Sequence, residues 1–127
     1  MPHTAEEEAL KVRACQEAYL RHIDSIREIS WGCGYAIGVH GSLKRDIDLI
    51  AVPWIRAASP ADVLALAIRD SLPGSMLVEK DDVYGTLKPH GRLAYTIILW
   101  DEPLVKRANK GWLCPFIDLS VLPRQTS

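Results

Sequence analysis

The first part of the chain follows a helical pattern of apolar and polar positions. Between residues 5 and 30, apolar side chains recur at steps of three and four, which places them on one face of a helix. Thr4 and Glu7 have the spacing of a capping box, and the acidic residues up to Glu8 suit the positive end of the helix dipole. Gly32 follows the last apolar position and is a typical residue at a helix C-terminus. The pattern therefore predicts one long amphipathic helix over residues 5–30.

Two short apolar segments follow, and each has the pattern of a β-strand. Residues 35–40 read YAIGVH and residues 46–54 read DIDLIAVPW. The segment GSLKR between them is too short for a helical crossover, so the two strands are predicted to pair as an antiparallel hairpin. Pro53 lies at the end of the second strand, where its missing N–H is tolerated.

The rest of the chain contains one more helical pattern and three more strand patterns. A helix is predicted over residues 59–74, with Ser59 as the N-cap and Pro60 at the first helical position. The predicted strands span 75–80, 93–100 and 115–124, and polar connections span 81–92 and 101–114. This order predicts an α+β fold, in which a mixed, mostly antiparallel β-sheet of about five strands packs both helices on one face.

Composition gives the scale and the setting of this fold. The chain has 127 residues, 48% hydrophobic and 24% charged, which predicts a single domain over 1–127 with a core at 31–122. The formal net charge of −1 provides no overall attraction to nucleic acid or to an acidic membrane. No apolar run reaches the ~20 residues of a membrane span, and the N-terminus lacks the pattern of a signal peptide. The three cysteines, Cys15, Cys33 and Cys114, are scattered along the chain and are interpreted as reduced thiols. We therefore expect a cytoplasmic protein without membrane contact.

Two aspartates alternate at the start of the second predicted strand. Because alternate residues of a strand share a face, Asp46 and Asp48 point to the same side of the sheet. Two neighbouring carboxylates repel each other unless a cation lies between them. Either both acids lie on a solvated face, neutralised by Lys44 and Arg45, or they bind a divalent metal such as Mg²⁺ (or Mn²⁺).

A third aspartate changes the balance between these interpretations. The last predicted strand contains FIDLSV, which has the same form as DIDLIAV and places Asp118 among apolar residues. An unpaired carboxylate in such surroundings is costly to bury. If this strand lies beside the one that carries Asp46 and Asp48, the three acids form one cluster. Such a cluster stabilises a fold poorly, but it suits a site with two metal ions.

Two turns supply groups that suit a phosphate. Gly41 and Ser42 precede the paired acids, and exposed N–H groups in such a turn bind anions, although the same residues are typical of any hairpin turn. The segment KPHGR places His90 and Arg92 around a proline and a glycine. These side chains are interpreted either as contacts to nucleotide phosphates or to an RNA acceptor, or as part of a solvated loop.

The stretch GVHGSLKRDIDLIAV resembles the nucleotidyltransferase superfamily, the DNA polymerase β-like enzymes, in which a Gly-Ser turn precedes a D-x-D strand and a later strand carries a third carboxylate. In size the chain is closest to the minimal single-domain members of that superfamily. It also looks similar to short phage and prophage reading frames. The resemblance implies transfer of a nucleoside monophosphate from an NTP to an acceptor with two metal ions. It implies metal binding by Asp46, Asp48 and Asp118, with Asp118 also helping to deprotonate the acceptor. The candidate nucleotide-binding residues are then Gly41, Ser42, Lys44, Arg45, His90 and Arg92.

Two features differ from that family and leave other functions open. Only Leu43, Lys44 and Arg45 separate Ser42 from Asp46, where the family has a longer link, and no helical substrate domain follows the core. The acceptor (RNA, protein or small molecule) would then be bound with help from a second copy in a homodimer or from a partner chain. One alternative is a catalytically reduced module that binds nucleotide or a protein or RNA partner, in a regulatory, phage or toxin–antitoxin-like role. Another is a metal-dependent phosphohydrolase or nuclease that uses the same acids.

Overall fold

The computed structural model describes residues 4–80 and 83–124, and the first element is the long helix α1, Ala5–Gly32. The capping box is confirmed: the Thr4 hydroxyl accepts a hydrogen bond from the Glu7 N–H at 3.1 Å, and the Glu7 carboxylate accepts one from the Thr4 N–H at 3.0 Å. Gly32 is still helical, so its predicted role as the cap is wrong. Cys33 ends the helix, and Gly34 supplies the left-handed conformation (φ 91°) that turns the chain into the first strand.

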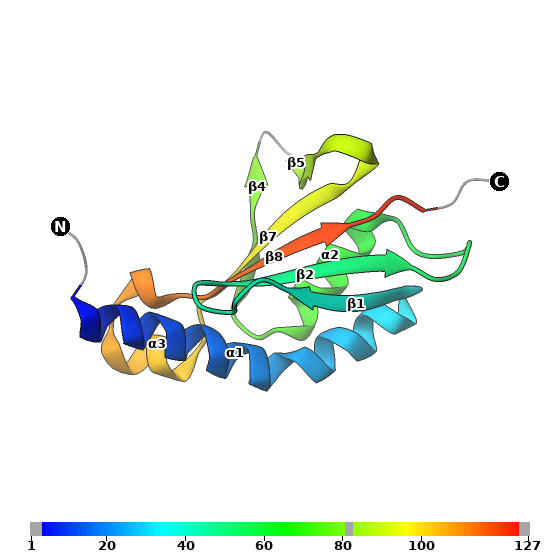
Figure 1. Ribbon diagram of the computed structural model, residues 1–127. Coiled ribbons are helices and arrows are strands. Elements are labelled where there is room, and N and C mark those ends of the chain that lie inside the picture. The colour runs from blue at the N-terminus through cyan, green and yellow to red at the C-terminus, as the bar shows by residue number, and fades with distance from the viewer. Residues whose placement is uncertain (1–3, 81–82, 125–127) are drawn as a thin grey trace.

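A mixed sheet forms the centre of the molecule (Figure 1). Its main strands run in the order β1-β2-β8-β7-β3, in which β2 and β8 are parallel and the other neighbours are antiparallel. The short β6 adds to β7, and β4 and β5 form a separate pair. The predicted hairpin and the mostly antiparallel character are confirmed. The strands are β1 Tyr35–His40, β2 Asp46–Pro53, β3 Ser75–Leu77, β4 Glu79–Lys80, β5 Val83–Tyr84, β6 Thr86–Leu87, β7 Leu93–Leu99 and β8 Phe116–Val121.

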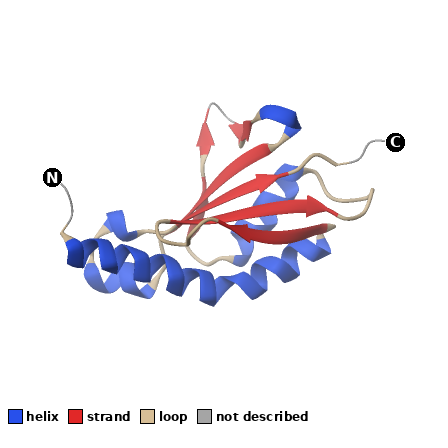
Figure 2. Ribbon diagram, viewed as in Figure 1, coloured by secondary structure: helices blue, strands red, loops and turns tan. Residues whose placement is uncertain are grey.

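Helices α1 and α2 (Ala61–Ser71) cover one face of the sheet, while β4, β5 and the 3₁₀ turn η1 (Pro89–Gly91) rise from the other (Figure 2). The predicted start of α2 is wrong by one residue: Pro60 is the N-cap, and no side chain caps the helix. Ser59 has a different role, because its carbonyl oxygen accepts a hydrogen bond from the Tyr35 hydroxyl at 2.6 Å.

A third helix, α3 (Pro103–Ala108), lies in the segment that the sequence predicted as a plain connection, and the 3₁₀ turn η2 (Gly111–Leu113) follows it. Its six residues are too few to show a helical period, and Asn109 ends it in the left-handed conformation (φ 52°). The expectation of two helices is therefore wrong for the described part of the chain, which contains three. No helix among the described residues is long and apolar enough to cross a membrane.

The core lies between the sheet and the two long helices, and strand alternation decides what faces it. In β2, Ile47 and Leu49 are fully buried against side chains such as Cys15 of α1 and Leu64 of α2. Asp46 and Asp48 alternate with these residues along β2 and therefore lie on the face that the helices leave uncovered.

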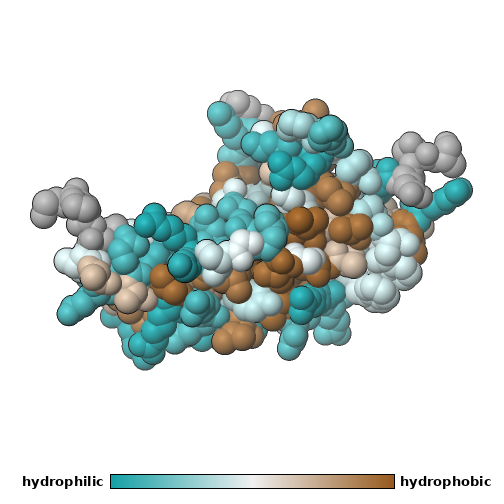
Figure 3. All heavy atoms as spheres, viewed as in Figure 1, coloured by the Kyte–Doolittle hydropathy of each residue, from teal (hydrophilic) through white to brown (hydrophobic). Residues whose placement is uncertain are grey.

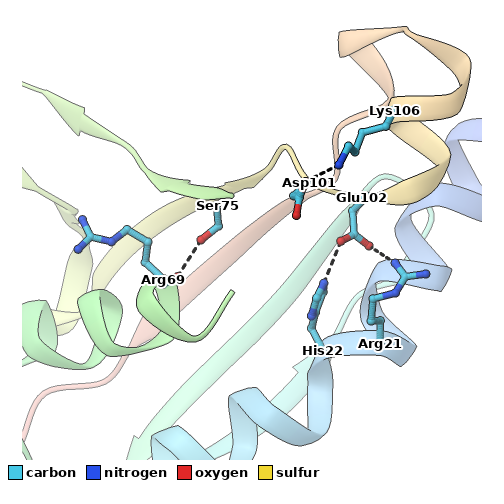
Figure 4. A network of polar contacts seen from close by, with 7 residues as sticks. All are labelled: Arg21, His22, Arg69, Ser75, Asp101, Glu102 and Lys106. Atoms are coloured by element: carbon cyan, nitrogen blue, oxygen red, sulfur yellow. Dashed lines mark hydrogen bonds and ion pairs between the residues drawn. The ribbon is translucent and has the colours of Figure 1, made fainter. Parts of the chain in front are cut away.

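A buried carboxylate joins α1 to the segment before α3 (Figure 4). Glu102 is 5% exposed, and it accepts hydrogen bonds from Arg21 at 2.5 Å and from His22 at 2.9 Å. Burial alone would raise the pKa of Glu102, but the hydrogen bond and charge of His22, together with Arg21, outweigh it and lower the pKa. The ionised carboxylate therefore stabilises the fold at this junction.

Candidate functional site

The three aspartates come together on the uncovered face of the sheet. Strands β2 and β8 are parallel neighbours, and their register places Asp48 directly opposite Asp118 and Asp46 opposite Phe116. The Asp118 carboxyl group lies close enough to Asp46 and Asp48 for both to act on its pKa. The adjacency on which the metal hypothesis depended is thus present, and it follows from the parallel pairing of two strands that lie far apart in the sequence.

The electrostatics of the cluster follow from this proximity. Burial raises the pKa of Asp118, and the nearby charges of Asp46 and Asp48 raise it further. The same acids act on Cys15 in the core below, where burial and then the charge of Asp46 raise the thiol pKa to about 11. The site therefore carries concentrated negative charge, which a bound cation would stabilise.

The site continues across the sheet as a row of polar side chains. The register places His40 of β1 opposite Asp48, and Thr96 of β7 opposite Asp118. Because residues in register on adjacent strands share a face, the row runs His40, Asp48, Asp118, Thr96 over four neighbouring strands. His40 is exposed at the open edge of β1.

The Gly-Ser turn packs against the paired acids. Gly41 has φ +79°, and a Cβ atom at this position would lie 2.6 Å from the Asp48 Oδ2 atom. Only glycine fits both the conformation and the close approach. Ser42 is exposed on the same turn. The turn is therefore shaped around the carboxylate of Asp48.

A pocket of about 350 Å³ opens over this row. Its size is at the lower end for a small-molecule site. Acids line it on β2 and β8, and hydroxyl and cationic side chains line it towards β6 and β7. The lining residues are His40, Asp48, Thr86, Lys88, Arg92, Ala94, Tyr95, Thr96, Asp118, Leu119 and Ser120.

One of the predicted phosphate-binding residues lines this pocket, and the others lie outside its lining. Arg92 lines it, whereas His90 is exposed at the tip of η1 and is not among the lining residues. Lys44 is exposed and also lies outside the lining, and Arg45 forms an ion pair with Glu8 of α1 at 3.2 Å. The sequence suggested that Arg45 neutralises the aspartates. In the structure Arg45 instead pairs with Glu8 of the N-terminal helix.

A cation that the sequence interpretation missed lies near Asp46. The Nζ atom of Lys11 donates hydrogen bonds to the carbonyl oxygens of Trp112 at 3.0 Å and Cys114 at 2.9 Å, and lies 5.3 Å from the centroid of the Phe116 ring. Burial lowers the pKa of Lys11, and the charge of Asp46 opposes that shift. The sequence signal that could have identified Lys11 is its position one turn before the buried Cys15, where a lysine interrupts the apolar face of the helix.

The chemistry of the site suits a hard metal ion, but its side chains do not form a finished ligand shell. Three carboxylates on adjacent strands are the oxygen donors that Mg²⁺ and Mn²⁺ prefer. Within residues 4–80 and 83–124, however, no group of three or more His, Cys, Asp or Glu side chains is arranged to hold a metal ion. A metal would therefore bind only if the three aspartate side chains rearranged to face the ion. No family model, curated protein or solved structure matches this chain.

Proposed function

We propose that this chain is a metal-dependent nucleotidyltransferase, which moves a nucleoside monophosphate from an NTP to an acceptor hydroxyl. The observation that carries the proposal is the register of Asp48 on β2 with Asp118 on β8, with Gly41 packed against the Asp48 carboxylate. Acids placed in this way repel one another, so they weaken the fold unless a cation binds them. A pocket that joins Asp48 and Asp118 to cationic side chains suits a substrate with negative charge.

The proposed reaction gives each acid a role. Asp46 and Asp48 would hold two Mg²⁺ or Mn²⁺ ions, and Asp118 would hold one of them. When bound, these ions neutralise the charge of the reacting phosphate and of the leaving group. The acceptor oxygen forms a bond to the α-phosphorus, and the bond between that phosphorus and the α–β bridging oxygen breaks. The electron pair of the broken bond leaves with pyrophosphate, and Asp118 accepts the proton of the acceptor hydroxyl.

A second candidate function is a module that binds nucleotide without transferring it. Two observations favour it: Arg45 is held by Glu8, away from the pocket lining, and the described acids form no finished metal-ligand group. Such a module would bind an NTP in the same pocket and act on a protein or RNA partner through binding alone.

A transfer assay separates the two functions. The protein is incubated with Mg²⁺ and α-labelled NTPs, and it is offered RNA, protein and small hydroxyl compounds together as acceptors. We expect label in one acceptor class with the wild-type chain, none with Asp46→Asn combined with Asp48→Asn, and wild-type transfer with the control Asp24→Asn, which changes an exposed acid of α1. Transfer that survives the double substitution contradicts the proposal. NTP binding without any transfer supports the second function.

A further inference from the structure

The pocket lined by Asp48 and Asp118 is chemically divided along the strand order. Asp48 and Asp118 lie on β2 and β8, and the next strands, β7 and β6, contribute Thr96 and Thr86. Beyond these hydroxyls the segment between β6 and β7 arches above the sheet, where the surface is mainly hydrophilic (Figure 3). The pocket thus changes from acidic to hydroxyl-bearing and cationic in one direction across the sheet.

Arg92 is positioned at the cationic end by a specific contact. Its Nη1 atom donates a hydrogen bond to the Ser120 hydroxyl oxygen at 2.8 Å. Ser120 is 8% exposed and lies two positions after Asp118, so it is on the same face of β8. A guanidinium group has five N–H donors in a planar fork, and such a fork matches two phosphate oxygens. The contact therefore holds the Arg92 guanidinium group, which is suited to phosphate, beside Ser120, two positions along β8 from Asp118.

Lys88 is brought to the same end by the shape of the loop. The Lys88 N–H donates a hydrogen bond to the Arg92 carbonyl oxygen at 2.7 Å, which closes the segment around η1. The closure requires left-handed conformations at His90 (φ 67°) and Gly91 (φ 77°). It leaves His90 at the tip and places Lys88 and Arg92 together at the neck of the loop, where both line the pocket.

The turn between β1 and β2 does not offer the same cations. Lys44 and Arg45 are exposed and lie outside the pocket lining, and Arg45 is paired with Glu8. A triphosphate brings about four negative charges at neutral pH, so it needs cationic side chains in addition to metal ions. Among the described lining residues, Lys88 and Arg92 are the cationic ones apart from the histidine His40.

We propose that Arg92 and Lys88, with the hydroxyl groups of Ser120 and Thr86, form the binding site for the β- and γ-phosphates of a nucleoside triphosphate. The phosphate chain then runs from the aspartates towards β7 and β6, rather than onto Lys44 and Arg45 in the β1–β2 turn. The inference rests on the proposed function for the identity of the substrate. It assigns the direction in which that substrate lies, and therefore which basic residues decide its affinity.

Inorganic tripolyphosphate tests this subsite without a base or sugar. Titration calorimetry in Mg²⁺ buffer compares the wild-type chain with Arg92→Gln, Lys88→Gln and the control Lys44→Gln, which removes an exposed cation from the β1–β2 turn. We expect affinity to fall by roughly ten-fold or more for Arg92→Gln, because a charge-assisted contact is lost. A smaller loss of roughly three-fold is expected for the exposed Lys88, and a change within about two-fold for Lys44→Gln.

Two further variants keep the test independent of folding. Ser120→Ala retains the guanidinium group but removes its anchor, so weaker tripolyphosphate binding with an unchanged circular dichroism spectrum is expected. Arg92→Lys retains the charge without the planar fork, and it should restore part of the affinity lost in Arg92→Gln. The inference is wrong if the wild-type chain does not bind tripolyphosphate at millimolar concentration, or if Lys44→Gln loses more affinity than Arg92→Gln.

Failure of this inference differs from failure of the proposed function. If tripolyphosphate binding depends on Arg92 but no nucleotide is transferred, the phosphate site stands and the transferase proposal falls. If nucleotide is transferred and both transfer and tripolyphosphate binding depend on Lys44 but not on Arg92, the transferase proposal stands and the assignment of the phosphate site is overturned.

Discussion

Asp48 of β2 and Asp118 of β8 lie directly opposite each other on parallel neighbouring strands, and Asp48 helps to raise the pKa of Asp118. Like charges directly opposite in a sheet destabilise it, and here burial adds to the cost. The chain therefore maintains an arrangement that its own stability does not favour. This relationship underlies the proposed function and leads to the first prediction.

Replacing Asp118 with asparagine should make the fold more stable in buffer without divalent metal. Asp118→Asn removes one of three neighbouring acids, so we expect the free energy of unfolding to rise by about 1 kcal/mol. Asp24→Asn changes the net charge equally at an exposed position of α1 and should have little effect. Urea unfolding at neutral pH with EDTA measures the free energy of unfolding of both variants. Destabilisation by Asp118→Asn would show that the carboxylates support the fold rather than strain it.

The turn around Asp48 should tolerate no side chain at Gly41. Gly41→Ala combines a left-handed conformation with a Cβ that would lie 2.6 Å from Asp48 Oδ2, so a loss of about 1–2 kcal/mol is expected from the conformation alone. Gly38→Ala is a matched control in β1, because its φ is not positive and its nearest neighbour atom lies at 4.0 Å. Thermal unfolding compares the two variants. Equal melting temperatures would contradict the close packing of the turn on Asp48.

The buried Glu102 should give the protein an acid-sensitive stability. Its pKa is lower in the folded chain than the ordinary value of 4.5, so its stabilising contribution is complete above that value and is lost as pH falls through the folded pKa. Glu102→Gln should destabilise the fold at pH 7 by about 3 kcal/mol and flatten the dependence of stability on pH below 4.5.

Urea unfolding between pH 3 and pH 7 checks this dependence, with Glu28→Gln as the control at an exposed position of α1. The control should retain both the stability and the acid-dependent loss of the wild-type chain. A Glu102→Gln variant that loses stability on acidification as steeply as wild type would mean that other acids cause the effect.

The three cysteines should differ in reactivity. Cys15 is fully buried with a thiol pKa raised to about 11 by burial and by Asp46, and burial also raises the pKa of Cys114. Cys33 is only half-buried. With Ellman's reagent at pH 8 we expect one thiol to react quickly, two to react only on unfolding, and the fast phase to disappear in Cys33→Ser. A fast phase that persists in that variant would contradict the buried position of the other two.

The elements that the sequence predicted well have strong local patterns. The capping box at Thr4 and the alternation in β2 and β8 each depend on neighbouring residues, and the structure places these elements within a few positions of the prediction. The short helix α3 was missed because its six residues carry no periodic signal. At the start of α2, the Ser59 carbonyl group accepts a hydrogen bond from the distant Tyr35, and no local pattern reveals this contact.

The candidate site likewise combines features that local sequence patterns predicted with contacts that they could not predict. Local alternation identified Asp46, Asp48 and Asp118, and the short link between the first two strands indicated their hairpin. The contacts of the cations are long-range, so the sequence could not assign them: Arg45 contacts Glu8, Arg92 contacts Ser120, and Lys11 lies near Asp46. Each depends on how elements pack in three dimensions rather than on residue spacing.

The most direct test of the metal site is a crystal structure of the chain soaked with Mn²⁺ and a non-hydrolysable NTP, recorded with anomalous scattering from manganese. We expect anomalous density between Asp46, Asp48 and Asp118, with the α-phosphate beside it. Bound NTP with no manganese at these aspartates, or manganese bound elsewhere on the chain, would contradict this expectation.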